Sequence, residues 1–441
     1  MLRVGFSEFD ITPPVGKLMP GGFTPCHTIE PARGKLIATA AAFDVDGNSL
    51  ILVSVDTLSF HVNTADRIRS TISDDTGIPF DRILVAATHT HTGGACDYQL
   101  WLCPPDPEVA SVTEKGAITA AINAYKSLSD ASVGTGKGQE DRYSFCRDIR
   151  LTDGSIKMNP NRAHPELMVS PIDTPDYSVN VMRIDSAEGE TRGFIVNYAN
   201  HPDCHAKNKK SFSADFPGAL RRGLKRVYGE NTFVLFFNGT AGDINCIDWL
   251  GTASDSYYGG IKNAPEAIGA GLTSTVVEIN AGIKADDTAP AISSISRNVI
   301  LARRYKSQAD LAWAKEIAKD MDSHNSMDRA FATEYLESDD DVSPEIPFEI
   351  HTIRLGNWAI VGLPSEIFTK VGRRIKEASP FENTLIFELA NGTHGYIATR
   401  IVHESTAYES KVSKVNACTA SDSADRIVEA ALAQLAELKN V

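Results

Sequence analysis

The sequence predicts an α/β protein in which a mixed β-sheet core is flanked by helices and the active site lies at the carboxyl ends of the strands. Short apolar runs of strand length recur along the 441 residues, and segments with helical spacing separate several of them. Four of these runs stop at clusters of His, Asp or Glu, and a fifth is followed by His and Tyr. Because ligands bind outside the carboxyl ends of strands in α/β folds, these clusters predict where the active site lies.

The first 94 residues predict a β-layer and one helix. Strands are expected at residues 3–11, 35–45 and 49–59, a helix at 64–76 and a buried strand at 84–87. Asp46-Gly47-Asn48 predicts a hairpin turn between the second and third strands, and Gly77 ends the helix.

The rest of the chain alternates between the same two kinds of element. A long irregular stretch reaches to about residue 175, and residues 308–347 predict a helical excursion followed by a solvated connection, because long helix formers give way to an acidic run. The remaining strands are expected at 179–184, 193–199, 232–237, 348–355, 358–363 and 385–389, and the remaining helices at 109–127, after 213–218, and at 264–282, 367–378 and 424–438.

Composition limits the kinds of partner. With 42% hydrophobic and 23% charged residues, the chain is an ordinary globular protein with a substantial core. The 43 basic and 57 acidic residues give a net charge of −14, which argues against a nucleic-acid or anionic membrane partner and leaves a small-molecule substrate. The start of the chain does not resemble a signal peptide, and the seven cysteines are scattered without a CxxC pair, so we expect a cytoplasmic protein with reduced thiols. The oligomeric state stays open.

The polar clusters at the strand ends predict a metal site. In an extended chain His89 and His91 project the same way, which suits a metal, or a metal and a proton carrier; surface loop histidines are the alternative. Glu366 could equally be a carboxylate at a helix N-terminus, and Tyr396 a packed core aromatic. Imidazoles with a carboxylate and an open position suit catalytic zinc. The clusters are His89 and His91, His201 and His205, Asp243 and Asn245, Glu366, and His394 with Tyr396.

Several motifs, in order along nearly the whole chain, resemble the catalytic domain of the neutral/alkaline (non-lysosomal) ceramidases. The resemblance implies a zinc ion bound by four residues, with His91 and Arg162 beside it in contact with the substrate and Tyr408 as a second active-site tyrosine. The implied zinc ligands are His89, His201, Glu366 and Tyr396. The matching segments are VGFSEFDITPP at 4–14, AATHTHTGG at 86–94, Asn161-Arg162, Asn200-His201-Pro202, ADFPG at 214–218, NGTAGDIN at 238–245, GLPSEIFTKVGRR at 362–374 and GYIAT at 395–399, continuing through Tyr408.

The sequence departs from this family at one important position. Where ceramidases read GDVSP and the serine is assigned a nucleophilic role, this chain reads Gly242-Asp243-Ile244-Asn245-Cys246. Asparagine cannot be that nucleophile, and facing and register argue against Cys246 as its substitute. We expect residues 1–441 to form a single ceramidase-like catalytic domain without the family's secretion signal or its immunoglobulin-like C-terminal domain, and we therefore do not expect ceramide as the substrate.

The first functional hypothesis is a zinc-dependent hydrolase that cleaves an amide or ester in a small polar substrate with metal-activated water. His91 would act as general base or acid, and Asp243 would orient an imidazole or hold the metal. Arg162, Tyr408 and the backbone amides around residues 239–242 would stabilise the oxyanion, and Asn245 would orient substrate or water. Two alternatives stay open: a zinc-dependent lyase or isomerase acting on a sugar or hydroxy acid, and a catalytically inactive binding protein.

Overall fold

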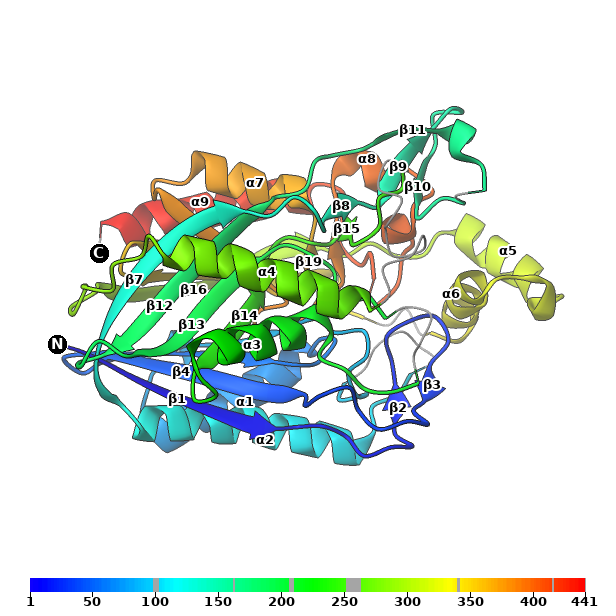
Figure 1. The fold of residues 1–441 in the computed structure, drawn as a ribbon. Coiled ribbons are helices and arrows are strands. Elements are labelled where there is room, and N and C mark those ends of the chain that lie inside the picture. Colours follow the sequence, from blue (N-terminus) through cyan, green and yellow to red (C-terminus); the bar gives the residue numbers. More distant parts are fainter. Residues whose placement is uncertain are drawn as a thin grey trace.

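Two mixed β-sheets flanked by helices form the fold, which confirms the α/β prediction (Figure 1). The structure is a computed structural model and describes residues 1–97, 103–161, 163–205, 210–250, 263–338, 342–414 and 416–440. The eight-stranded sheet has the order β14 (Phe233–Asn238), β13 (Thr191–Tyr198), β12 (Ser178–Ser186), β7 (Ser129–Gln139), β1 (Leu2–Asp10), β4 (Ile37–Val45), β5 (Asn48–Val55) and β6 (Ile83–Ala87). The four-stranded sheet has the order β16 (Ile292–Ala302), β17 (Glu345–Leu355), β18 (Trp358–Leu363) and β20 (Asn383–Glu388).

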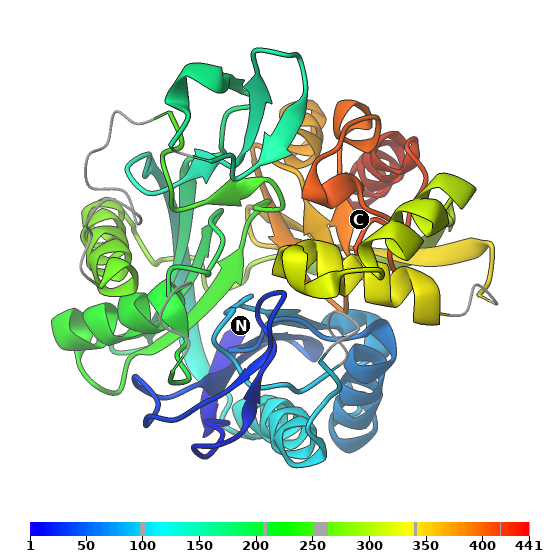
Figure 2. The ribbon, with the colours of Figure 1, turned by 90° about the vertical axis from the view of Figure 1, so that its right-hand side faces the viewer.

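One pattern of elements occurs three times along the chain. In each unit three antiparallel strands are followed by a helix, a fourth strand parallel to the third, and a second helix. Figure 2 shows the three units as blue, green and orange-to-red sectors around a common centre. The first unit is β1-β4-β5-α1-β6-α2, the second β7-β12-β13-α3-β14-α4 and the third β16-β17-β18-α7-β20-α9. The helices are α1 (Val62–Thr76), α2 (Pro107–Lys126), α3 (Asp215–Tyr228), α4 (Ala264–Asn280), α7 (Thr369–Ala378) and α9 (Ser423–Lys439).

The fourth strands of the three units, β6, β14 and β20, pack against one another in the central core. Their inward side chains belong to one buried apolar cluster, and the rings of Phe237 and Phe387 stack with centroids 4.2 Å apart. Since all three strands run in the same direction along this core, their carboxyl ends meet at one end of the molecule. The cluster includes Leu84 and Ala86 of β6, Leu235 and Phe237 of β14, and Leu385 and Phe387 of β20.

An insertion follows the first strand of every unit, and all three insertions lie at the same end of the molecule, around its centre (Figures 1 and 2). The third contains two helices within residues 308–347, so the predicted helical excursion is present. The first insertion is the hairpin β2 (Leu18–Met19) and β3 (Cys26–His27); the second contains β8 (Phe145–Cys146), β9 (Asp148–Leu151), β10 (Ile156–Met158) and β11 (Met168–Pro171); the third contains α5 (Gln308–Ile317) and α6 (Ser326–Glu337).

Several strands of the structure were not predicted from the sequence, among them β7, β16 and the three strands β9, β10 and β11. β7 carries Gly134, Gly136 and Gly138 on one face, which removes the apolar alternation that predicts a strand. A Cβ atom at Gly136 would lie 2.7 Å from Ile279 and 2.8 Å from Ile283, so glycine is what lets α4 and the chain after it pack onto this strand. The stretch predicted as irregular up to residue 175 contains the small sheet β10-β9-β11.

The remaining short elements connect the main ones near the carboxyl ends of the strands. None of the helices in the described ranges combines the length and apolar composition that a bilayer crossing requires. The short elements are β15 (Ile244–Asn245), β19 (Glu366–Ile367), β21 (Tyr396–Ile397), α8 (Arg400–His403) and the 3-10 turns η1 (Phe80–Arg82), η2 (Pro165–Leu167), η3 (Met321–Ser323) and η4 (Tyr408–Ser410).

Candidate metal centre

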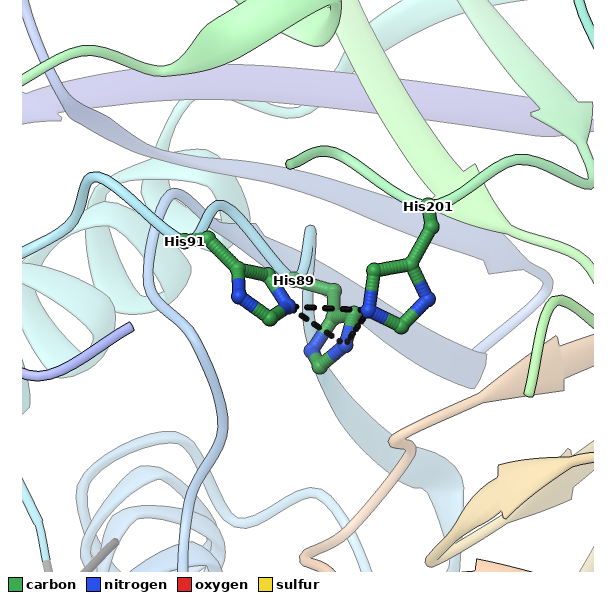
Figure 3. Close-up of side chains that lie close together, drawn as sticks. All are labelled: His89, His91 and His201. Carbon is green, nitrogen blue, oxygen red and sulfur yellow. Dashed lines mark hydrogen bonds between the residues drawn. The ribbon is translucent and has the colours of Figure 1, made fainter. Parts of the chain in front are cut away.

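Three buried or half-buried histidines meet at the carboxyl ends of the strands (Figure 3). The Nε2 atom of His201 lies 3.1 Å from Nε2 of His89 and 2.9 Å from Nε2 of His91, and the latter two atoms are 3.3 Å apart. Oε2 of Glu366 lies 3.2 Å from Nε2 of His89 and 4.0 Å from Nε2 of His201. The chain therefore brings together four predicted site residues from segments that follow β6, β13 and β18.

His89 reaches this position from a tight turn, so the extended chain assumed for His89 and His91 is not what the structure has. Strand β6 ends at Ala87, and His89 has a φ of +68°. The left-handed conformation costs about 1–2 kcal/mol for a residue other than glycine, so the surroundings must hold it. The hydroxyls of Thr90 and Thr92 donate to the carbonyl oxygen of Ser213 at 2.7 and 2.9 Å and fasten the turn.

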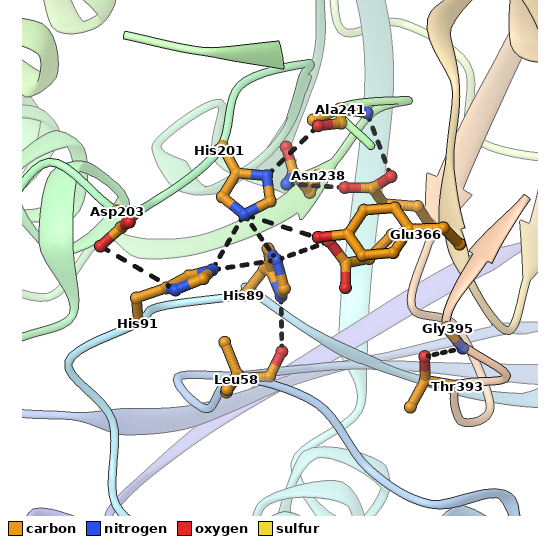
Figure 4. Close-up of polar contacts among 12 residues, drawn as sticks. Leu58, His89, His91, His201, Asp203, Asn238, Ala241, Glu366, Thr393 and Gly395 are labelled. Atoms are coloured by element: carbon orange, nitrogen blue, oxygen red, sulfur yellow. Dashed lines mark hydrogen bonds and ion pairs between the residues drawn. The ribbon is translucent and has the colours of Figure 1, made fainter. Parts of the chain in front are cut away.

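Backbone carbonyls fix the orientation of two of the imidazoles. Nδ1 of His89 donates to the oxygen of Leu58 at 2.8 Å, and Nδ1 of His201 donates to the oxygen of Ala241 at 3.2 Å (Figure 4). Because a carbonyl only accepts, each ring carries its proton on Nδ1, and the two Nε2 lone pairs face each other. Two lone pairs at this separation repel unless a proton or a metal ion lies between them.

The donor set fits a zinc ion. Zn–N bonds of about 2.0–2.1 Å at a tetrahedral angle place two nitrogen ligands about 3.3–3.4 Å apart, close to the separations of the histidine Nε2 atoms. Oε2 of Glu366 is buried and, apart from its contact with His89, has no hydrogen-bond partner among the described residues, which leaves it available as an oxygen ligand. Burial acts to raise the pKa of Glu366, but His89 and a hydrogen bond from Tyr396 outweigh it and lower the pKa, so the carboxyl is ionised as a ligand must be.

Tyr396 lies beside Glu366 because β21 pairs with β19 in parallel, with these two residues in register. Its hydroxyl accepts a hydrogen bond of 3.0 Å from Nη2 of Arg147. Burial and the nearby Glu366 raise the pKa of Tyr396, and the charge on Arg147 acts to lower it. The predicted ligand Tyr396 is thus brought to the site together with an arginine.

Arg147 is the site residue that the sequence analysis missed. Its buried guanidinium lies between Tyr396 and Glu409, with Nε and Nη2 at 2.9 and 2.8 Å from Oε1 of Glu409. It follows a two-residue strand within the stretch predicted as irregular, where no apolar run marks it. Arg162, the arginine predicted for the site, lies outside the described residues.

Tyr408 lies beside the site in a group of aromatic side chains. Its ring is 5.5 Å from the ring of Tyr396, measured between centroids, and 5.2 Å from that of Phe23 in the first insertion. On its other side it meets Phe331 of α6 at 5.9 Å. The predicted second tyrosine is therefore close to Tyr396, one of the predicted metal ligands, and two of the three insertions contribute aromatic rings beside it.

Asp243 and Asn245 support the neighbouring loops. Oδ1 of Asp243 accepts hydrogen bonds of 2.8 and 2.9 Å from the backbone N and the hydroxyl of Thr369, which fastens the start of α7; burial raises the pKa of Asp243 to about 6. Nδ2 of Asn245 donates to Oδ1 of Asn159 at 2.8 Å, and its Oδ1 accepts from the backbone N of Ile247 at 2.9 Å. These contacts are with neighbouring loops, and none of them is with the three histidines.

The other candidates at the strand ends also lie away from the three histidines. Nε2 of His205 is 3.1 Å from the hydroxyl of Ser213, and burial lowers the pKa of His205 to about 4. His394 is packed against the ring of Phe348 at 5.7 Å between centroids. Cys246 is buried in the apolar cluster beneath α3 and α4.

Comparisons with known proteins bear on the fold. No family model matches the sequence, and no curated protein matches it significantly. The chain is similar to the crystal structure of neutral ceramidase from Pseudomonas aeruginosa, with a TM-score of 0.74 and 16% identity, covering 100% of this chain and 74% of that one. A structure described as a ceramidase complexed with C2 matches with a TM-score of 0.74 and 14% identity over 100% of this chain and 75% of that one. The chain therefore has the fold of the neutral ceramidases, in agreement with the resemblance of its motifs.

Proposed function

We propose that this protein is a zinc-dependent hydrolase that cleaves an amide or ester bond in a small polar substrate. The observation that carries the proposal is the pair of Nε2 lone pairs of His89 and His201, held 3.1 Å apart with the Glu366 carboxylate beside them. A metal ion bound between the two nitrogens would relieve the repulsion of their lone pairs. The shared fold with neutral ceramidases supports hydrolysis as the reaction class.

His89, His201, Glu366 and Tyr396 would hold the zinc ion. Bound there, zinc supplies Lewis acidity for a scissile carbonyl and lowers the pKa of water. Metal-binding histidines usually donate their other ring N–H to a carbonyl or carboxylate, as both histidines of this set do.

His91 differs from the other two histidines and would be the proton carrier. Its side chain is 17% exposed, and its Nδ1 lies 3.9 Å from Oδ1 of Asp203, a carboxylate rather than a carbonyl. A base that faces a carboxylate and is open to solvent can take a proton from water and return it to the leaving group. His91 would carry out both transfers.

Arg147 would stabilise the developing oxyanion, the role predicted for Arg162. Its guanidinium is held by Glu409 and donates to Tyr396, so it is fixed before the substrate arrives. Preorganised cations in a site that excludes water stabilise negative charge at the transition state. Tyr408 would line the space beside it.

Metal analysis of the purified protein tests the zinc site. We expect about one zinc per chain, with most of it lost in His89→Ala and in Glu366→Ala, whereas His91→Asn should keep its metal and lose about 10²–10⁴-fold in activity. His205→Asn is the matched control, because it removes a histidine from a neighbouring loop without touching the cluster. Unchanged zinc in the two ligand variants would overturn the proposal, and loss of zinc in His91→Asn would make His91 a ligand.

The reaction class needs a second experiment. A panel of N-acyl compounds, esters and lactones is incubated with the enzyme in ¹⁸O-labelled water. Incorporation of the label into a product supports hydrolysis. Turnover without incorporation would identify a lyase or isomerase, and tight ligand binding by calorimetry without turnover would identify a binding protein.

A further inference from the structure

Glu388, the last residue of β20, lies at the centre of the three units. In each unit the parallel strand pair ends on one register pair: Val55↔Ala87, Tyr198↔Asn238 and Leu363↔Glu388. Ala87, Asn238 and Glu388 are therefore equivalent positions, and their strands meet in the central core. Glu388 is fully buried there, next to the residues that carry the metal-binding side chains.

Three hydrogen bonds hold the Glu388 carboxylate. Oε2 accepts from the backbone N of Ala241 at 3.0 Å and of Ile367 at 3.1 Å, and Oε1 accepts from Nδ2 of Asn238 at 3.0 Å. All three partners donate, so they fit the ionised carboxylate. Burial opposes this charge and raises the pKa of Glu388 to about 8, while the nearby His89 acts to lower it.

Two of the partners of Glu388, Ala241 and Ile367, belong to segments that position proposed metal ligands. Ala241 accepts the Nδ1 proton of His201 through its carbonyl oxygen at 3.2 Å (Figure 4), and Ile367 directly follows Glu366. A rotation of the Ala241 peptide would move its carbonyl and hence the His201 ring. A shift at Ile367 would move the Glu366 carboxylate.

The backbone directly after Glu388 has an unfavourable left-handed conformation. Leu389 has a φ of +51°, a conformation that costs about 1–2 kcal/mol for a residue with a side chain. Its backbone N donates to the oxygen of Ser365 at 3.2 Å, and its oxygen accepts from the backbone N of Ala87 at 3.3 Å. The 388–389 segment therefore joins the end of β6, which leads to His89, to the loop that carries Glu366.

We propose that Glu388 is a positioning residue for the metal centre: through Ala241 and Ile367 it sets the orientation of His201 and Glu366. The inference rests on the proposed zinc site and adds a residue that does not itself touch the metal. Changes in such outer partners of metal ligands typically lower metal affinity about 10–100-fold.

Two variants test whether the metal centre depends on the hydrogen bonds of Glu388 or only on a side chain of its size. Glu388→Gln keeps the size, but its NH₂ group faces the donor Nδ2 of Asn238, so at least one of the three bonds is lost. Adding Asn238→Asp restores the pattern, since the new carboxylate accepts from that NH₂ group and also from the backbone N of Asn200, as the Asn238 oxygen does at 3.2 Å. The double variant has the same net charge as the original protein.

The test is zinc affinity, measured by competition with a chelator, together with the visible absorption of the cobalt-substituted protein, which reports coordination geometry. We expect Glu388→Gln to bind zinc about 10–100-fold more weakly with an altered cobalt spectrum, and Glu388→Gln/Asn238→Asp to recover both. Glu349→Gln, which breaks a buried ion pair with Arg69 far from the site, should lower stability and leave both readouts unchanged. If Glu388→Gln does not fold, Glu388→Asp, whose shorter side chain cannot keep all three bonds, is compared with the wild-type protein without the change at Asn238.

Several results would overturn the inference. If the original protein binds zinc and the folded Glu388 variant binds it equally well with the same spectrum, Glu388 does not position the centre. The same conclusion follows if the double variant is as impaired as the single one. If the original protein binds no zinc, the proposed function itself fails and takes this inference with it.

Discussion

Replacing Arg147 with Met should lower the free energy of unfolding by about 3–5 kcal/mol, because it breaks a buried ion pair. Nε and Nη2 of Arg147 lie 2.9 and 2.8 Å from Oε1 of Glu409, and both side chains are buried. Burial acts to raise the pKa of Glu409, and the arginine opposes it. Without the guanidinium, Glu409 is left buried beside Asp148, another buried carboxyl, with its charge unpaired.

Urea denaturation of the metal-free protein at pH 7 measures this loss without a contribution from metal binding. Arg147→Met/Glu409→Gln removes the unpaired charge together with the arginine, so it should be at least about 2 kcal/mol more stable than Arg147→Met. Activity should stay low in both variants, since neither restores the guanidinium beside Tyr396. A loss below about 1 kcal/mol in the single variant, or no recovery in the double variant, would refute the reasoning.

Three further predictions address the backbone, the packing and the pH dependence. Gly395→Ala should lower the free energy of unfolding, measured by urea denaturation, by about 1–3 kcal/mol more than Gly154→Ala does. Both glycines have positive φ, but only at Gly395 would a Cβ atom lie 1.9 Å from a backbone oxygen. Equal losses in the two variants would contradict this prediction. Gly136→Val should cost at least about 1–3 kcal/mol in the same assay, since its side chain meets α4, and a neutral effect would contradict the packing of β7. Burial acts to lower the pKa of His89, but the carboxylate of Glu366 outweighs burial and raises this pKa. Because zinc binds the neutral ring, zinc affinity should fall about tenfold for each pH unit below the pKa of His89. Chelator competition that gives the same zinc affinity from pH 8 to pH 5 would contradict this prediction.

The sequence predicted the strands whose two faces are both buried. The core strands β5, β6 and β13 read as near-continuous apolar runs, because each is covered by a helix on one side and by the central core on the other. β7 was not predicted because glycines, which allow α4 to pack closely, take the place of apolar residues on one face. β16 was not predicted because much of its surface is polar or exposed. The threefold repeat of the units was not predicted either, because it is a repeat of strand order and strand pairing and not of sequence.

The candidate site was predictable where its residues follow such strands, as His89, His201 and Glu366 do. Arg147 was not, because its role depends on a contact with Glu409, 262 residues further along the chain. The extended geometry assumed for His89 and His91 was also wrong, since the turn that brings their rings together depends on hydrogen bonds to the distant Ser213.

The three insertions are separate from the strand pairing of the units. The third one leaves the sheet at Ala302 and returns at Glu345, and these two residues are paired across adjacent strands. A simple hairpin turn in its place would therefore keep the pairing of β16 with β17, but it would remove Phe331 from its contact with Tyr408. The surroundings of Tyr408 can in this way vary while the strand pairing of the three units stays the same.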